Sequence, residues 1–171
     1  MKWILRILVL LVVLIAIALA IGYALPAQHT LTRSIVLKQT PDNVFAVLAD
    51  LPNMPSWNHG VKKIEMLPPI DGKEASRQTL DGNMVMTIIT TESTPPNHLV
   101  RTVGDAKGPF SGSWTYNIRP TDDGSEVSLT EDATVPNPVF RLMCQIFGPT
   151  KYLDEHLTDL AKHFGETATI K

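Results

Sequence analysis

Apolar side chains recur at helical spacing through residues 138–166, which predicts one long amphipathic helix over this stretch. The apolar stripe keeps its phase across Gly148-Pro149, so we interpret this pair as a kink or as a division into two collinear pieces. We expect the whole stripe to face the interior of the protein. Its members are Val139, Leu142, Met143, Ile146, Leu153, Leu157, Leu160 and Phe164.

Extended segments with alternating apolar and polar residues fill most of the chain before this helix. Turn sequences rich in Gly, Pro, Asp and Asn separate them, and Asp81-Gly82 is the best candidate for a two-residue hairpin. A helix capped by Thr40 and begun at Pro41 follows the first strand, and a short helix or turn precedes the second. The predicted strands cover residues 29–38, 61–67, 74–80, 84–93, 98–104, 110–119 and 126–135.

The alternation also assigns one face of this antiparallel sheet to the interior. Phe110, Trp114 and Tyr116 share that face, and Gly112 between them marks a bend or a close approach by another group. In the last strand Glu131 lies in the apolar phase, which places one carboxylate among apolar neighbours. An apolar sheet face has to be covered, and the C-terminal helix is the only later element long enough to cover it.

The N-terminal segment is the most specific signal in the sequence. Residues 7–25 carry no charge, and their 19 positions match the length of a bilayer-spanning helix. A cleaved secretory signal ending near Ala18-Leu19-Ala20 is the alternative, although the apolar run continues beyond that site. Because Lys2 and Arg6 precede the run, the positive-inside rule predicts a single-pass protein of the inner or plasma membrane, with a cytoplasmic N-terminus and an extracytoplasmic domain.

Residues 1–27 form an anchor and a short tether in this interpretation, and residues 28–171 form a separate domain. Without Lys2 and Arg6 the chain has 13 basic against 17 acidic residues, a balance that does not favour binding to nucleic acid. Cys144 is the only cysteine, so no disulfide forms within the chain, and we interpret it as a small buried apolar residue. The oligomeric state stays open.

The order of elements and four sequence stretches resemble the START-like (SRPBCC) superfamily, in particular its bacterial branch of polyketide cyclases/dehydrases and lipid-transfer proteins. The stretches are TPDNVFAVLADLPNMPSWN, FSGSWTYNIRP, GSEVSLTEDATVPNPVFR and YLDEHLTDLAKHFGE, and the resemblance covers residues 29–166. It implies an α+β helix-grip fold, in which a curved antiparallel sheet of about seven strands wraps around a long C-terminal helix. It also implies a deep apolar cavity for a hydrophobic ligand, and it brings no catalytic signature.

The resemblance and the inner-face pattern together define candidate residues for lining such a cavity. These candidates are Trp57, Met84, Met86, Trp114, Tyr116, Glu131, Met143, Leu153 and Leu157. Glu131 is the one candidate for catalysis, because a carboxylate in an apolar pocket can act as a general acid or base. The alternative is that Glu131 pairs with Arg101 or Arg77 or lies near the cavity mouth, which leaves the site without a catalytic residue.

The five histidines show no spacing typical of a metal site, so we expect neither a metal nor another cofactor. Tyr152, His156, Asp159 and His163 share one side of the C-terminal helix. We interpret this side as a solvated flank with a pair between Asp159 and His163, since residues four apart are neighbours on a helix. A polar site at the cavity mouth is the alternative.

These features predict a membrane-anchored module that binds a hydrophobic small molecule or lipid between the sheet and the C-terminal helix without catalysing a reaction. A second hypothesis is an enzyme of the cyclase or dehydratase type that acts on a hydrophobic substrate. A third is an interaction domain whose cavity is filled by Phe110, Trp114 and Tyr116. Cavity volume separates the third hypothesis from the others, because ligand pockets measure roughly several hundred Å³.

Overall fold

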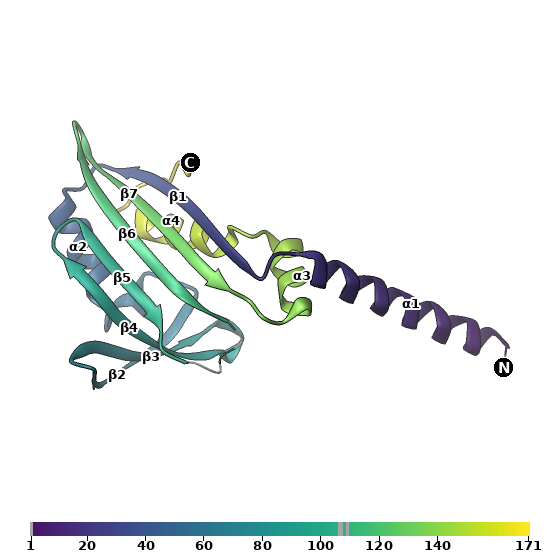
Figure 1. Ribbon diagram of the computed structural model, residues 1–171. Coiled ribbons are helices and arrows are strands. Elements are labelled where there is room, and N and C mark those ends of the chain that lie inside the picture. Colours follow the sequence, from purple (N-terminus) through teal and green to yellow (C-terminus); the bar gives the residue numbers. More distant parts are fainter. Residues whose placement is uncertain (1, 106–107, 109) are drawn as a thin grey trace.

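The long N-terminal helix α1 (Lys2–Ala24) projects away from the rest of the protein in the computed structural model (Figure 1). The structure describes residues 2–105, 108 and 110–171. Within α1 only Gly22 is buried, and the mean hydropathy of the most apolar stretch is 3.3. The helix is therefore long and apolar enough to cross a membrane, although its composition and its place near the N-terminus also fit a signal sequence.

Seven antiparallel strands form one curved sheet in the order β1-β7-β6-β5-β4-β3-β2 (Figure 1). The strands are β1 (Gln28–Leu37), β2 (Val61–Ile70), β3 (Lys73–Leu80), β4 (Val85–Thr94), β5 (His98–Val103), β6 (Ser111–Thr121) and β7 (Gly124–Thr134). Every predicted strand is present, with ends displaced by no more than three residues. The alternation of apolar and polar residues therefore located the sheet correctly.

Two local features of the sheet test the sequence interpretation. Gly112 marks a close approach, because a Cβ atom there would lie 2.0 Å from the carbonyl oxygen of Asp132 on β7. The hairpin predicted at Asp81-Gly82 forms between β3 and β4, but its two-residue turn is wrong, since the chain turns through the three-residue 3-10 helix η2 (Asp81–Asn83). The Leu80 N–H closes this turn by donating to the Met84 carbonyl at 2.8 Å.

Two helices follow β1, as the sequence predicted. Helix α2 (Pro41–Ala49) begins at Pro41, and the Thr40 side chain accepts a hydrogen bond from the Asn43 N–H. The 3-10 helix η1 (Met54–Ser56) follows and buries Met54 in a small cluster with Leu51 and Val61. This segment carries Trp57 and the residues after it toward the C-terminal helix.

The C-terminal stretch forms two helices, α3 (Pro138–Phe147) and α4 (Lys151–His163), which run in different directions (Figure 1). Gly148 ends α3 with a φ of 102°, a conformation that residues with a Cβ atom rarely adopt. Helix α4 packs against β1 and β7, whereas α3 contacts α1. The prediction of one apolar stripe that covers the sheet from end to end is therefore wrong for its first half, because the break gives each half a different neighbour.

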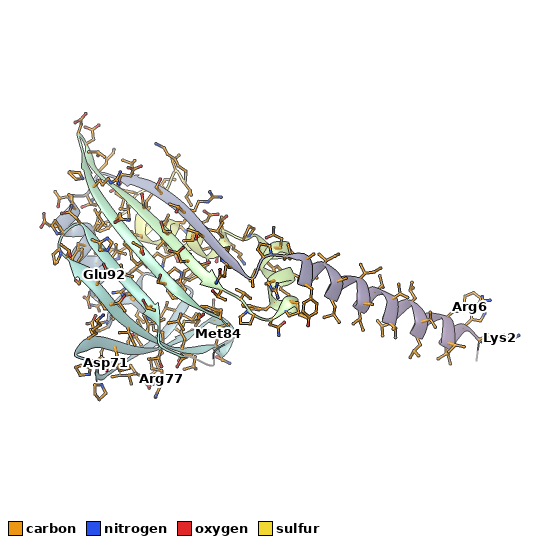
Figure 2. The ribbon with its side chains drawn as sticks, in the orientation of Figure 1. Lys2, Arg6, Asp71, Arg77, Met84 and Glu92 are labelled. Atoms are coloured by element: carbon orange, nitrogen blue, oxygen red, sulfur yellow. The ribbon has the colours of Figure 1, made fainter. Side chains whose placement is uncertain are left out.

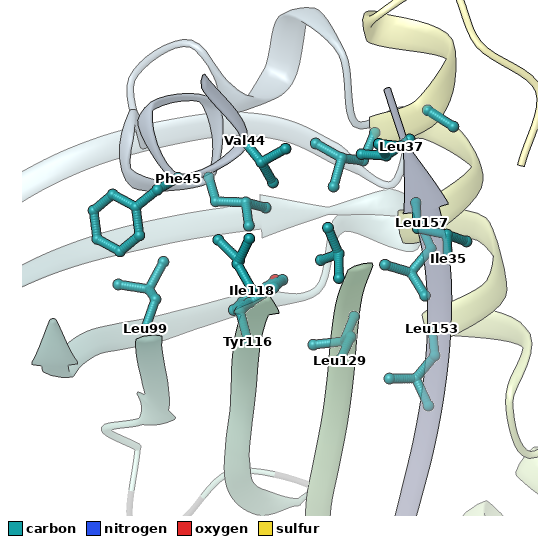
Figure 3. Packing of buried hydrophobic residues seen from close by; sticks show 14 residues of the cluster. Ile35, Leu37, Val44, Phe45, Leu99, Tyr116, Ile118, Leu129, Leu153 and Leu157 are labelled. Carbon is teal, nitrogen blue, oxygen red and sulfur yellow. The ribbon is translucent and has the colours of Figure 1, made fainter. Parts of the chain in front are cut away.

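The main core lies between α2, α4 and the inner face of the sheet (Figure 3). Burial of this apolar surface holds α4 in the grip of the sheet, as the predicted α+β helix-grip fold requires. The cluster consists of Ile35, Leu37, Val44, Phe45, Leu48, Leu99, Tyr116, Ile118, Val127, Leu129, Leu153, Leu157, Leu160 and Ala161.

Candidate functional site

A small polar cavity lies between the inner face of the sheet and α4. Its volume of about 20 Å³ is enough for one or two water molecules and far below that of a typical ligand pocket. Among the described residues, the space between sheet and α4 is therefore nearly filled, as the interaction-domain hypothesis expects, and the deep apolar cavity that the resemblance implied is not found there. Strands β3, β4, β5 and β6 contribute most of its wall, and η1 and α4 contribute the rest. The lining residues are Met54, Gln78, Leu80, Met86, Ile88, Arg101, Trp114, Tyr116, Tyr152 and His156.

Arg101 on β5 is the dominant charge in this cavity, and only 3% of the residue is exposed. Its Nη2 atom donates to the Leu48 carbonyl at 2.6 Å, while Nε and Nη1 have no partner. Within the described ranges no carboxylate forms an ion pair with this guanidinium. Burial lowers the pKa of Arg101, but a guanidinium starts from so high a value that it keeps its proton. The cavity therefore contains a positive charge without an ion-pair partner.

A hydrogen-bonded chain from Asn58, just after η1, to Tyr116 on β6 passes through His156 on α4. The Asn58 Oδ1 atom accepts from the Gly60 N–H at 3.0 Å, so Asn58 uses its Nδ2 group to donate to His156 Nδ1 at 2.8 Å. A neutral imidazole has one N–H, which this assignment places on Nε2. That N–H donates to the Tyr116 hydroxyl oxygen at 3.0 Å and leaves the tyrosine O–H free to donate elsewhere.

Burial keeps His156 and Tyr116 neutral near neutral pH. Desolvation, with a further contribution from the nearby Arg101 charge, lowers the pKa of His156 to about 4. Desolvation raises the pKa of Tyr116 to about 12 against the opposing effect of Arg101. The His156 imidazole is therefore neutral, with a single proton assigned to Nε2. Tyr116 keeps its hydroxyl proton.

These assignments make the polar wall a set of donors. The Nε and Nη1 nitrogens of Arg101 and the O–H of Tyr116 are available donors, and each can only be satisfied by an acceptor. Hydrogen bonds from a guanidinium are strongest to a charged acceptor. The arrangement thus complements a carboxylate, a phosphate or an enolate oxygen, or a neutral carbonyl.

An open groove of about 640 Å³ lies next to this cavity. Met86 lines both of them, and the Phe110 ring in the groove contacts the Trp114 ring in the cavity with a centroid distance of 6.2 Å. The groove has the volume of a ligand pocket and a largely apolar wall. Its residues include Met84, Val85, Met86, Val103 and Phe110, with Arg77 and Asp105 at polar positions.

Glu131 contacts neither Arg101 nor Arg77, so the predicted pairing with an arginine is wrong. Its carboxylate accepts from Trp114 Nε1 at 2.8 Å and lies 3.1 Å from His29 Nε2. Arg77 instead lies 3.7 Å from Glu65 on the neighbouring strand β2. Glu131 therefore fixes the orientation of the Trp114 ring in the cavity wall.

The polar side of α4 is not the solvated flank that the sequence indicated. His156 and Asp159 are both buried, because η1 and the residues after it cover them. Asp159 accepts from the His59 backbone N–H at 3.1 Å, contacts the His59 ring and lies 3.8 Å from Lys162. The predicted pair between Asp159 and His163 is therefore replaced by a contact with a residue distant in sequence.

The other predicted cavity residues are distributed over three environments. Trp57 packs its ring against His156 with a centroid distance of 5.3 Å. Leu153 and Leu157 are fully buried in the main core, and Met143 lies on the exposed side of α3. Of the candidates, Met86, Trp114 and Tyr116 line the polar cavity, and Met84 and Met86 line the groove. Binding of a ligand by any of them stays a prediction.

The sequence interpretation missed Arg101 and Gln78 as parts of one site, whereas Tyr152 and His156 line the cavity together, as its alternative of a polar site on this side of the helix allowed. A signal for Arg101 was present, because it alternates with Leu99 and Val103 in the inner phase of β5, as Glu131 does in β7. Among the described residues, no three His, Cys, Asp or Glu side chains are grouped so that they could hold a metal ion.

A curved antiparallel sheet closed around a C-terminal helix, with a cavity between them, defines a helix-grip protein. The chain belongs to the family described as polyketide cyclase / dehydrase and lipid transport, whose model matches residues 28–165. No curated protein is similar enough to count as a match.

Solved structures share this fold at low sequence identity. The Zhui aromatase/cyclase from Streptomyces sp. R1128 has a TM-score of 0.65 at 14% identity, over 78% of this chain and 91% of that one. A START superfamily protein from Mycobacterium smegmatis has a TM-score of 0.59 at 16% identity, over 75% and 94%. The di-domain aromatase/cyclase StfQ has a TM-score of 0.65 at 10% identity over 78% of this chain, which covers 50% of that protein. Likeness at these identities establishes the fold alone.

Proposed function

We propose that the protein is a membrane-tethered module that binds a hydrophobic small molecule through an acceptor group, preferably an anionic one such as a carboxylate. The observation that carries this proposal is the buried Arg101 guanidinium, whose Nε and Nη1 nitrogens have no hydrogen-bond partner, beside a cavity. A buried charge without a partner is costly, so an anionic ligand would relieve a cost that the empty fold bears. The family description, which includes lipid transport, supports the hydrophobic class of ligand.

In this proposal the polar end of the ligand binds in the cavity, and its apolar part binds in the groove. The polar cavity accommodates a group of only a few atoms, whereas the groove of about 640 Å³ accommodates an apolar chain or ring system. Met86 forms part of both walls, and its unbranched thioether side chain changes rotamer readily. A rotamer change at Met86 would connect the two spaces.

The membrane tether is the second part of the proposal. Residues 7–25 cross the bilayer, and Lys2 and Arg6 remain on the cytoplasmic side, at the end of α1 farthest from the sheet (Figure 2). Residues 28–171 then form an extracytoplasmic ligand-binding domain close to the lipid surface. Met84 at one end of the groove lies nearer to α1 than Asp71 and Glu92 do (Figure 2).

The test compares two fluorescent probes that differ only in their polar end. The full chain is purified in a mild detergent, delipidated, and titrated with the polyene fatty acid parinaric acid and with the corresponding fatty alcohol. Because a charge-assisted hydrogen bond is worth about 1.5 to 3 kcal/mol, we expect the acid to bind roughly tenfold or more tightly than the alcohol. Mass spectrometry of the organic extract from the undelipidated protein would identify the natural ligand.

Arg101→Gln is the decisive variant, and Arg119→Gln is its control. Arg119 is an exposed arginine on β6, so its loss should leave both titrations unchanged. We expect Arg101→Gln to bind the acid and the alcohol equally. Failure of the wild-type protein to bind either probe, or an undiminished preference for the acid in Arg101→Gln, would refute the proposed site.

A cyclase or dehydratase is the second candidate, and the same donor set favours it. Arg101 and Tyr116 could stabilise an enolate oxygen that develops during the condensation of a ketone-bearing chain, as preorganised donors do in other enzymes. The buried His156 would act by orienting the Tyr116 hydroxyl. Turnover of a poly-ketone substrate that Tyr116→Phe slows much more than it weakens binding would favour this candidate over a pure binding module.

A further inference from the structure

We propose that the exposed apolar face of α3 lies in the headgroup region of the same bilayer that α1 crosses, so that the protein touches the membrane through two elements. This inference rests on the proposed membrane tether. It starts from an anomaly of the C-terminal stretch, in which α3 has the apolar pattern of a buried helix but no described part of the protein covers that pattern.

The exposed apolar residues occupy one continuous sector of α3. Val139, Met143, Ile146 and Phe147 are 49%, 45%, 69% and 65% exposed. At 100° per residue they fall within an arc of about 100°, which is the width of the apolar stripe of an amphipathic helix. Arg141 and Gln145 lie on the opposite side, so α3 has separate polar and apolar faces.

The polar side of α3 is fixed to the end of α1. Arg141 Nη1 donates to the Leu25 carbonyl at 2.6 Å, and Nη2 donates to the Pro136 carbonyl at 3.0 Å. The two backbones also meet closely, because a Cβ atom at Gly22 would lie 2.3 Å from the Pro138 carbonyl oxygen. The position of α3 along α1 is therefore set by direct contacts.

The length of α1 places that contact at the membrane boundary. The 19 uncharged residues rise about 28 Å as a helix, close to the hydrocarbon thickness of about 30 Å. Gly22 lies less than one turn before Leu25, the last residue of the run, so α3 begins at the level where headgroups replace acyl chains. Figure 1 shows α3 lying across the end of α1 at this level.

The occupant we infer is lipid because α3 is held at the end of the apolar run of α1 and leaves most of its apolar face exposed there. An amphipathic helix in the interface buries its apolar side by several ångströms and keeps its polar side out of the hydrocarbon. The stretch between Asp132 and Asp154 contains no acidic residue and carries Arg141 and Lys151, which suits an anionic lipid surface. A protein partner is the other outcome that the test below can reveal.

Contact with the bilayer would also bring the groove to the lipid surface. Phe140 of α3 stacks on Phe110 with a centroid distance of 6.5 Å and an interplanar angle of 12°, and Phe110 lines the groove. A hydrophobic ligand could then pass between membrane and groove without crossing water. The position of α3 thus adds an entry route to the proposed binding function.

The test reads the depth of single fluorescent labels in the full chain. Cys144 is the only cysteine, so a Cys144→Ser background allows an NBD label at Ile146→Cys on the apolar face or at Gln145→Cys on the polar face. The proteins are reconstituted into phosphatidylcholine/phosphatidylglycerol vesicles that contain lipids with a nitroxide near the top of the acyl chain. We expect the label at position 146 to be quenched several-fold more strongly than the label at position 145.

A third label, at Val13→Cys in the middle of α1, separates the two proposals. Quenching of this label by a nitroxide near the end of the acyl chain establishes the tether. If position 13 is quenched but positions 146 and 145 are equally water-exposed, α3 does not touch lipid and only the present inference fails. If position 146 is shielded from water but not quenched by lipid, a protein covers α3 and the inference fails as well. Loss of quenching at position 13 would refute the tether itself.

Discussion

Helices α3 and α4 follow each other in sequence and share one apolar phase, but their apolar faces have opposite fates. The face of α4 is fully buried at Leu153, Leu157 and Leu160, where it packs against the sheet. Most of the face of α3 is exposed, apart from the Phe140 ring that stacks on Phe110, and the polar side of α3 contacts the end of α1. An amphipathic pattern therefore shows that a helix has an apolar face to bury, but it does not identify the surface that buries it.

The difference originates in the residues between and around the two helices. Gly148 adopts a φ of 102° and redirects the chain, so α3 leaves the line of α4. Arg141 then hydrogen-bonds to the carbonyl oxygen of Leu25 and holds α3 against the end of α1. As a result, the exposed part and the sheet-facing part of one stripe are separated by residues 148–150, of which Gly148 has the positive φ.

The largest expected effect compares one apolar truncation in each helix. Leu157→Ala should lower the free energy of unfolding by about 2 to 5 kcal/mol, because it leaves a cavity in the main core. Ile146→Ala should change it by less than about 0.5 kcal/mol, because this side chain is already exposed. Denaturant titration of the full chain in detergent micelles measures both. A loss at Ile146 as large as that at Leu157 would mean that α3 is packed against protein.

The second prediction concerns the polar side of α4, which is buried where that of α3 is not. The folded state holds the pKa of His156 near 4, below the ordinary value of 6.5, so the unfolded chain binds more protons between these pH values. The contribution of His156 to the free energy of unfolding should therefore be fully present above pH 6.5. It should fall by up to about 3 kcal/mol as the pH drops toward 4. The rings of Trp57, Tyr116 and Tyr152 and the polar groups of Asn58, Arg101 and Asp159 lie near His156, and of these only the Asp159 charge opposes the shift.

The measurement is the melting temperature of the full chain as a function of pH. His156→Gln should flatten the decline between pH 6.5 and pH 4, because the titrating group is gone. His163→Gln is the matched control, since it removes an exposed histidine from the end of the same helix and should leave the profile unchanged. An unchanged slope in His156→Gln would show that other groups cause the decline.

The parts of the fold governed by local pattern could be predicted from the sequence. Alternation located all seven strands and put Trp114 and Tyr116 on the inner face, and the capping pattern at Thr40 located α2. The polar site was harder because its members meet only in three dimensions. His156 contacts Asn58, which lies 98 residues earlier, and no periodicity encodes that pairing.

The same limit explains the misplaced residues. Met143 has the correct phase to line a cavity, but phase could not reveal that α3 would turn toward α1. Arg101 is different, because its place in the inner phase of β5 was visible in the sequence. A charged residue in the apolar phase of a strand indicates a buried polar site even where its partners are unknown.

The smallest expected effect on stability comes from substitutions between α3 and α4. They distinguish two explanations of why the helix breaks there. Gly148→Ala should lower the free energy of unfolding by about 1 to 2 kcal/mol, because alanine at a φ of 102° is strained. No side chain obstructs the new methyl group, since the nearest atom is Lys151 Cβ at 3.7 Å. Pro149→Ala should change stability by less than about 0.5 kcal/mol, because the contacts of α3 with α1 and of α4 with the sheet hold the two helices apart.

The pair is measured by denaturant titration, with circular dichroism as a readout of helix content. If the glycine conformation sets the break, Gly148→Ala destabilises the protein and Pro149→Ala leaves helix content unchanged. If the missing N–H of the proline causes the break, Pro149→Ala increases the helix content, because the two helices join. Gly148→Ala then changes the helix content in the same direction. The second result would restore the single kinked helix that the apolar stripe predicts, and it would move the exposed face of α3 away from the end of α1.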